Sequence, residues 1–128
     1  MSSGTQALWI AQMARVLANK IHAWCRRLPK DEYWTLGIQI TRSADGISAN
    51  LCEGFGRKHV GDTLHFISMA RGSLEETMDG IRKALDRRLI EHLRGMELLE
   101  SYAKLAQHIG KRARTLEAAA PNRSKRSR

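Results

Sequence analysis

Proline, aromatic residues and long apolar runs are all scarce in this chain of 128 residues, and each shortage narrows what the chain can be. The two prolines, Pro29 and Pro121, lie far apart, so no proline interrupts a helix between them. No apolar stretch reaches the roughly 18 residues that a membrane-spanning helix needs, and polar residues interrupt the apolar start of the chain. We therefore expect no signal peptide, no membrane partner and a cytoplasmic protein.

Cysteine residues and paired metal ligands are equally scarce. Cys25 and Cys52 each fall within an expected helix among apolar residues, which predicts two buried, reduced thiols rather than a disulfide or a reactive site. No two of the five histidines have the i, i+4 spacing of a helical metal site, and the adjacent Glu75 and Glu76 face different directions on a helix. The sequence therefore predicts no metal, no cofactor and no enzymatic activity.

Apolar residues are abundant, and along four segments they recur at steps of three and four. This spacing is typical of helices that bury one face, and no stretch alternates with period two over the length of a strand. The four predicted buried rows are Ile10, Met13, Leu17, Ile21, Trp24 and Leu28; Leu36, Ile40, Ala44, Ile47 and Leu51; Ile67, Ala70, Leu74, Met78, Ile81 and Leu85; and Leu89, Leu93, Met96, Leu99, Ala103, Ala106, Ile109, Ala113 and Leu116.

Short segments separate the predicted helices. Asp31 is expected to cap the second helix, and Asp62 or Thr63 the third. Gly54-Phe55-Gly56 is expected to end the second helix, with a glycine in the left-handed conformation of a helix C-cap. The break between the third and fourth helices, which neither glycine nor proline marks, is placed near residues 86–88.

Four amphipathic helices with short connections predict an all-α fold, an antiparallel up-down-up-down four-helix bundle. We expect residues 1–120 to form this single domain. After Pro121 the apolar periodicity is lost, so residues 121–128 are expected to be a disordered basic tail.

The formal net charge of +9 is concentrated at the C-terminal end. Residues 111–128 contain seven basic residues and the single acid Glu117, a net of +6 that leaves +3 for the rest of the chain. A basic end attracts polyanions such as RNA or DNA, and it is equally compatible with a role in solubility alone. The candidate nucleic-acid-binding residues of this end are Lys111, Arg112, Arg114, Arg123, Lys125, Arg126 and Arg128.

A second basic cluster follows the glycines that end the second helix. Arg57, Lys58 and His59 place positive charge beside backbone N–H groups that Gly54 and Gly56 leave accessible, which suits a phosphate. A capped helix end with a solvated basic turn is the simpler explanation of the same residues. The three basic side chains are therefore candidates for nucleic-acid binding, and the alternative is that they only form a solvated turn at the end of a helix.

Small and polar residues form a second row on the second helix, one residue out of step with its apolar row. Such a row forms either a hydrogen-bonded seam between helices or a contact to another subunit or ligand. Antiparallel pairing about a turn near His59 favours the seam. It predicts Gly46 near Gly72 and Ser73, Arg42 near Glu76 as an ion pair, and Asn50 and Glu53 near the backbone groups of the loop.

Two short motifs lie within this seam, Asn-x-x-Glu-Gly at residues 50–54 and Gly-Ser-x-x-Glu at residues 72–76. With these motifs, the segment from Leu28 to Leu85 resembles the bacterial four-helix-bundle proteins encoded in intervening sequences of large-subunit ribosomal RNA genes. The accessory proteins of diversity-generating retroelements are a related branch, and the motifs do not separate the two. The matching positions, to which we assign a structural role, are Arg42, Asn50, Glu53, Gly54, Gly72, Ser73 and Glu76.

The resemblance implies a four-helix protomer that assembles into a ring-like homopentamer and associates with nucleic acid. In the retroelement branch it also implies docking on a reverse transcriptase. It supplies no catalytic residues.

Two hypotheses for function follow. The leading one is a non-enzymatic, oligomeric scaffold or adaptor that binds RNA or DNA through its basic surface and tail. The alternative is a protein–protein interaction module with incidental affinity for nucleic acid. Trp9, Tyr33 and Trp34 lie off or beside the apolar rows and are its candidate interface anchors.

Overall fold

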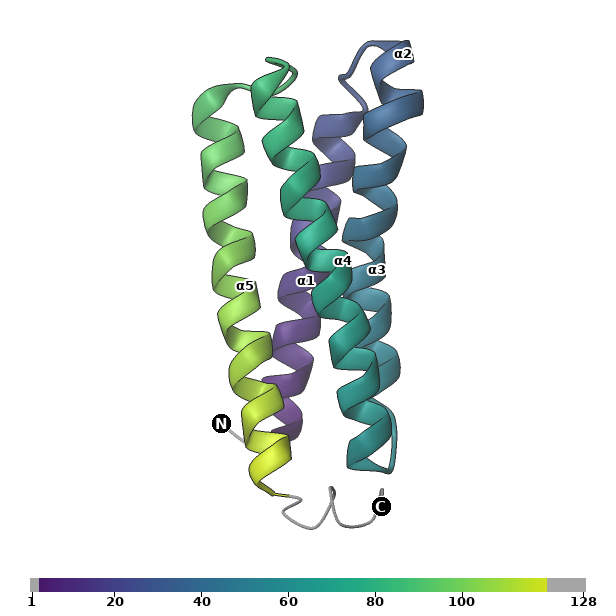
Figure 1. Ribbon diagram of the computed structural model, residues 1–128, viewed down its shortest axis with the longest axis vertical. Helices are drawn as coiled ribbons and strands as arrows, with labels where there is room; N and C mark the ends of the chain where they lie inside the picture. Colours follow the sequence, from purple (N-terminus) through teal and green to yellow (C-terminus); the bar gives the residue numbers. More distant parts are fainter. Residues whose placement is uncertain (1–2, 120–128) are drawn as a thin grey trace.

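The computed structural model describes residues 3–119, and every regular element within that range is helical. α2, η1 and α3 follow one another without a break and form one rod. Four long rods lie side by side and run alternately up and down (Figure 1), as predicted for an all-α bundle. The elements are α1 (Ser3–Cys25), α2 (Lys30–Glu32), the π-helical turn η1 (Tyr33–Gly37), α3 (Ile38–Phe55), α4 (Val60–Asp86) and α5 (His92–Ala118).

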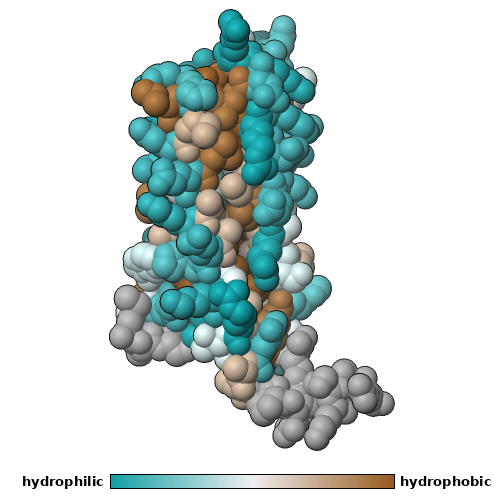
Figure 2. Space-filling view, turned by 60° about the vertical axis from the view of Figure 1, so that its left-hand side comes forward, coloured by the Kyte–Doolittle hydropathy of each residue, from teal (hydrophilic) through white to brown (hydrophobic). Residues whose placement is uncertain are grey.

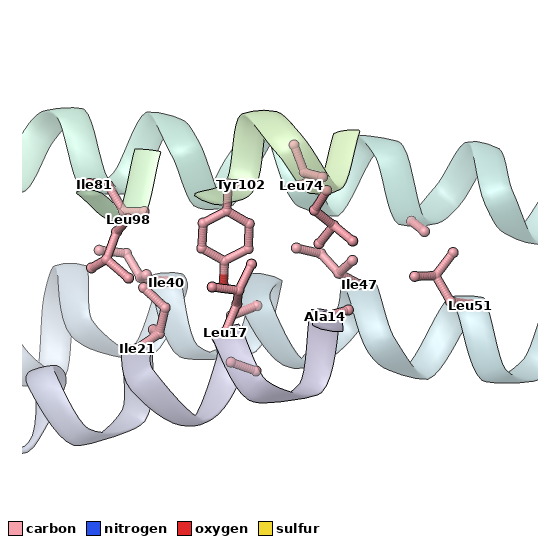
Figure 3. Packing of buried hydrophobic residues seen from close by; sticks show 14 of the residues in the cluster. Ala14, Leu17, Ile21, Ile40, Ile47, Leu51, Leu74, Ile81, Leu98 and Tyr102 are labelled. Atoms are coloured by element: carbon pink, nitrogen blue, oxygen red, sulfur yellow. The ribbon is translucent and has the colours of Figure 1, made fainter. Parts of the chain in front are cut away.

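Apolar residues from all four rods meet along the bundle axis. Ile21, Ile40, Ile81 and Leu98, one from each rod, are at most 3% exposed and lie at one level of the core (Figure 3). Tyr102 of α5 fills the neighbouring level and is fully buried. Burying each side chain of this size contributes about 1.5–3 kcal/mol, so the core is what holds the rods together.

The buried rows predicted for the first three helices are confirmed. All of their residues are buried except Met13, Met78 and Leu85, which are half-buried and pack against the core. The steps of three and four therefore identified the correct face of α1, α3 and α4.

The face predicted for the fourth helix is wrong over its first half. Leu93 and Met96 are 67% and 48% exposed, whereas Gly95 and Tyr102 face the core. A Cβ at Gly95 would lie 2.5 Å from Cδ2 of Leu85. The glycine thus makes room for a side chain of α4, and a search for large aliphatic residues passes over such a position.

The helix starts differ from the predicted caps. Asp31 lies inside the first turn of α2, and α4 begins at Val60, before Asp62 and Thr63. Neither α2 nor α4 has a side-chain cap. Gly56 follows the last residue of α3 as predicted, but its φ of −86° is right-handed, so no left-handed glycine ends this helix.

The turn between α4 and α5 begins where the sequence placed it but is longer than predicted, because Leu89 lies in the turn and not in the fourth helix. α4 ends at Asp86 and α5 begins at His92. Arg88 in this turn has a φ of 56°, and it is the sole non-glycine residue with a positive φ between residues 3 and 119. The N–H of Leu89 donates to the Ala84 carbonyl at 2.8 Å and closes the turn.

The two cysteine thiols lie in different environments. Cys25, the last residue of α1, is 1% exposed, and burial raises the pKa of its thiol to about 12. Cys52 is exposed, so the prediction of two buried thiols is wrong for this residue. Its neighbour Leu51 faces the core, which turns Cys52 outward on α3. Neither thiol is in a disulfide.

Candidate nucleic-acid interface

The polar row on α3 forms a seam with α4, as the pairing argument predicts. Thr77 Oγ1 donates to Ser43 Oγ at 2.8 Å, and the Ser43 hydroxyl donates to the Ile40 carbonyl at 3.0 Å. Both hydroxyl-bearing residues are at most 7% exposed. A Cβ at Gly46 would lie 3.0 Å from Ser73 Oγ, so the two helices approach each other closely at this level.

The loop end of the seam is held by Thr63 and Gly54. The Thr63 hydroxyl donates to the Gly54 carbonyl at 2.9 Å, which satisfies a carbonyl in the last turn of α3. A Cβ at Gly54 would lie 2.7 Å from Cβ of Phe66. Gly54 of the Asn-x-x-Glu-Gly motif is therefore a position of close contact between α3 and α4. Thr63 satisfies the backbone at the loop, which is the role that was predicted for Asn50 and Glu53.

Asn50 and Glu53 do not reach the loop backbone. The Asn50 amide donates to the Gly46 carbonyl of its own helix at 2.9 Å, and Glu53 pairs with Arg57 at 2.6 Å. Both predictions are wrong because each side chain finds a partner one helical turn away. Gly72 is also outside the seam, since it is exposed and no atom lies within 4 Å of a Cβ built on it.

Arg42 and Glu76 do not form the predicted ion pair within the described part of the chain, although both line one open groove of about 450 Å³. In the same groove, Lys83 pairs with Asp79 at 3.2 Å. Because Arg42 and Glu76 are exposed rather than buried between the helices, they are available to a partner on this face. Of the motif residues, Gly54 is buried and Ser73 half-buried at the contact between α3 and α4, whereas Arg42 and Glu76 are exposed in the groove.

The basic turn at residues 57–59 is exposed throughout. The Arg57 guanidinium is held by Glu53 and lies over the Phe66 ring, 4.8 Å from its centroid, so its charge is partly compensated. Lys58 and His59 have no ion-pair partner among residues 3–119. Lys58 is therefore the accessible, unpaired cation of the turn, and the His59 side chain lies exposed beside it.

The basic residues of α5 are not equivalent. Lys111 and Arg114 are exposed, but Arg112 is only 9% exposed, and its Nε is buried without a hydrogen-bond partner. Arg112 shares the inward face with Ile109 and Ala113, so little of its side chain is accessible to a phosphate. Arg123, Lys125, Arg126 and Arg128 lie outside the described residues.

The basic turn and the C-terminal end of α5 lie at the same end of the bundle (Figure 1). Nearby, a groove of about 420 Å³ between α4 and α5 is lined by His65, Arg71 and Glu117 together with apolar residues. Arg71 was missed from the sequence because it lies far along the chain from either basic cluster. Antiparallel pairing of α4 with α5 places Arg71 near the C-terminal part of α5, and this pairing is the signal that could have identified it.

The two side chains with a clearly raised pKa, Cys25 and Tyr102, are both buried. Tyr102 has a raised pKa, chiefly because burial disfavours the phenolate and also because of Asp45 and Cys25, but it is enclosed by the core. Residues 3–119 contain no group of three His, Cys, Asp or Glu residues placed to hold a metal ion. Over the same residues, no helix is both long and apolar enough to cross a membrane.

The family model of the 23S rRNA-intervening sequence protein matches residues 6–111 of the chain. The chain belongs to this family. No curated protein matches it. The family match covers the whole α3–α4 seam and most of α5, and it ends at Lys111, so Arg114 and the residues that follow lie beyond it.

Proposed function

We propose that this member of the 23S rRNA-intervening sequence family is a non-enzymatic, oligomeric scaffold that binds RNA or DNA. The supporting observation is the meeting of two basic segments at one end of the bundle (Figure 1). Lys58, His59, Lys111 and Arg114 are exposed there, and the chain continues from that end into a sequence with four more basic residues. The gene context in the family name is consistent with an RNA partner.

Contacts from such residues would be made with phosphates rather than base edges. Exposed lysine and arginine side chains neutralise phosphate charge and release counterions, which gives salt-sensitive binding with little sequence preference. Phe66 is half-buried beneath Arg57, whereas Trp9 is 39% exposed and makes an edge contact with His108 of α5 at 4.7 Å between ring centroids. Base stacking would therefore rest mainly on Trp9 and contribute less than the phosphate contacts.

The test is binding of labelled single- and double-stranded RNA and DNA across a salt series. The variant Lys58→Gln/Lys111→Gln/Arg114→Gln removes three cations of the basic end, and a chain ending at residue 119 removes the four that follow while keeping every described helix. Each should weaken binding and lower the slope of log K against log salt by up to about 0.9 per lost contact to duplex DNA.

The matched control is Arg15→Gln/Lys20→Gln/Arg82→Gln, which removes the same charge from exposed positions elsewhere on α1 and α4. It should leave the slope close to that of the original chain. Equal losses in the control and in the basic-end variant would show that net charge, and not this surface, governs binding.

Self-assembly is the second component of the proposal, with a homopentameric ring as the form that the family resemblance implies. Its support is exposed apolar surface: Leu8 and Val16 on α1, and Leu93 and Met96 on α5, are 48–67% exposed. Figure 2 shows apolar residues gathered in a lengthwise stripe between hydrophilic ridges on the side where α5 comes forward. A ring would multiply weak phosphate contacts through avidity. Light scattering coupled to size exclusion measures the assembly, and a monomer at micromolar concentration would exclude it.

A protein-interaction module is the second candidate function. It is favoured by Trp34, which is 63% exposed and makes an edge contact with Tyr33 at 5.5 Å between ring centroids. Exposed tryptophan is typical of interface anchors. A stoichiometric protein partner, such as a reverse transcriptase, that survives nuclease treatment and is lost in Trp34→Ala would favour this function over the scaffold.

A further inference from the structure

A pocket of about 650 Å³ opens between the α1–α2 turn and the α4–α5 turn, at the end of the bundle opposite the basic end (Figure 1). Three arginines line it, namely Arg27, Arg88 and Arg94, together with the single acid Glu91. They come from two segments that are far apart in the sequence: Arg27 precedes Pro29, whereas Arg88 and Arg94 flank the start of α5. The fold therefore assembles a basic site that neither a local motif nor the overall charge reveals.

The three guanidinium groups have no carboxylate within 4.0 Å in the described part of the chain. Among residues 3–119 the ion pairs of lysine and arginine are those of Arg57, Lys83 and Lys104, so unpaired cations are common, and what distinguishes these three arginines is that they line one pocket. Unpaired cations around a concavity favour an anion, because a bound anion would relieve their mutual repulsion.

The walls of the pocket are held in place. Trp24 Nε1 donates to the Leu89 carbonyl at 3.2 Å and ties α1 to the α4–α5 turn. Arg88 is the left-handed residue that follows the last turn of α4, where the N–H groups of Arg88 and Leu89 donate to the carbonyls of Leu85 and Ala84 at 3.2 and 2.8 Å. This hydrogen-bonded turn fixes the backbone that carries Arg88.

The floor of the pocket is apolar. Trp24, Leu28 and Ile90 line it and are at most 9% exposed. An apolar floor with charged groups at the rim is the arrangement of a site for a small molecule or the end of a chain, and the volume lies in the usual range for such sites.

We infer that this pocket binds a phosphate group, carried either by a small phosphorylated molecule or by the terminal phosphate of a nucleic acid. Arginine presents paired N–H donors that match two oxygens of one phosphate, which lysine does not. α5 begins beside the pocket without a side-chain cap, so the N–H groups of its first turn add donors near the arginines. The inference does not depend on the proposed function, because the pocket and the basic end share no residue.

The test uses the full chain and three probes at fixed ionic strength: pyrophosphate, a short single-stranded RNA with a 5′-phosphate, and the same RNA with a 5′-hydroxyl. The pocket variant is Arg27→Gln/Arg88→Asn/Arg94→Gln, in which asparagine suits the left-handed position. Arg15→Gln/Lys20→Gln/Arg82→Gln is the control of equal charge, and circular dichroism establishes that both variants fold. Calorimetry should show saturable binding of pyrophosphate that the pocket variant weakens at least about tenfold and the control leaves unchanged.

The RNA probes distinguish the two sources of phosphate. A preference for the 5′-phosphorylated RNA that is lost in the pocket variant but kept in Lys58→Gln/Lys111→Gln/Arg114→Gln supports a nucleic-acid end. Binding of pyrophosphate without that preference supports a small phosphorylated molecule. Absence of saturable pyrophosphate binding in the millimolar range, or equal weakening in the control, overturns the inference. Salt-sensitive RNA binding that persists in that case would leave the proposed function standing.

Discussion

A Cβ at Gly80 of α4 would lie 2.5 Å from Cγ1 of Ile40 on α3. Ile40 is 1% exposed and enclosed by the core, so it cannot move aside without disturbing its neighbours. Gly80→Ala should therefore lower the free energy of unfolding by about 1–3 kcal/mol, although alanine favours helix more than glycine does. Urea unfolding followed by circular dichroism measures the change.

Gly72→Ala is the matched control for this substitution. Gly72 lies in the same helix, is exposed, and would have no atom within 4 Å of its new Cβ. Here the helix propensity of alanine acts alone, so stability should rise by about 0.5–1 kcal/mol. If both variants shift stability in the same direction, close packing is not the reason for glycine at position 80.

The hydroxyl pair in the α3–α4 seam makes a separate prediction. Thr77→Val keeps the shape of the side chain but removes the hydroxyl that lies 2.8 Å from Ser43 Oγ and 2.9 Å from the Ser73 carbonyl oxygen, so it should cost about 0.5–1.5 kcal/mol of stability. Ser43→Ala/Thr77→Val should cost less than the sum of the single changes, because either single change already breaks the bond between the two hydroxyls and it can be lost only once. Additive losses in the double-mutant cycle would mean that the two hydroxyls do not interact.

Tyr102 carries a hydroxyl with no hydrogen-bond partner although the residue is fully buried. Tyr102→Phe removes the cost of this unsatisfied group and keeps the ring, so it should raise the free energy of unfolding by about 1 kcal/mol. Tyr102→Leu, which leaves unfilled space beside the core of Figure 3, should lower it. A loss of stability in Tyr102→Phe would reveal a partner for the hydroxyl, such as a bound water.

Much of the fold followed from apolar spacing alone. The rows on α1, α3 and α4 are correct because mostly large apolar side chains recur on their inward faces at steps of three and four. On α5 the same rule selected the exposed Leu93 and Met96, since the inward face there begins with Gly95 and makes room for Leu85. A glycine that is required by a neighbour's side chain carries no hydrophobic signal, so its role appears only in three dimensions.

The candidate sites were less predictable than the fold. Pairing about the α3–α4 turn correctly placed Gly46 beside Ser73. In two antiparallel helices, residues that lie equally far from the turn along the chain face each other, so the position of the turn predicts the pairs. The pocket around Arg27, Arg88 and Arg94 joins both turns at one end of the bundle, so no contiguous stretch of sequence contains it. From the sequence, Arg112 is indistinguishable from the other basic residues of the C-terminal end. In the structure it is buried, whereas its neighbour Lys111 is exposed.

The two thiols should react at very different rates. Cys52 is exposed, whereas Cys25 is buried with a pKa of about 12, so little of it is thiolate near neutral pH. A maleimide should label the native protein at Cys52 alone, and Cys52→Ser should abolish labelling until the protein is unfolded. Rapid labelling of native Cys52→Ser would show that α1 opens at its C-terminal end.

Burial of Cys25 also predicts how stability changes in alkali. The folded pKa is about 12 against an ordinary value of 9.0, so above pH 9 the unfolded chain releases a proton that the folded chain keeps. The contribution of Cys25 to stability is complete below pH 9 and is lost as pH rises toward 12. Cys25→Ala should therefore show a shallower decline in the free energy of unfolding than the original chain.

The interval between pH 9 and pH 10 isolates this effect, because the ordinary pKa of the buried Tyr102 is 10.0 and its ionisation in the unfolded chain begins to matter above that. Cys25→Ala also leaves a small cavity, but that cost is the same at both pH values and cancels in the slope. Cys52→Ala, which removes an exposed thiol, should keep the slope of the original chain. Equal slopes in all three proteins would mean that Cys25 loses its burial at alkaline pH before the bundle unfolds.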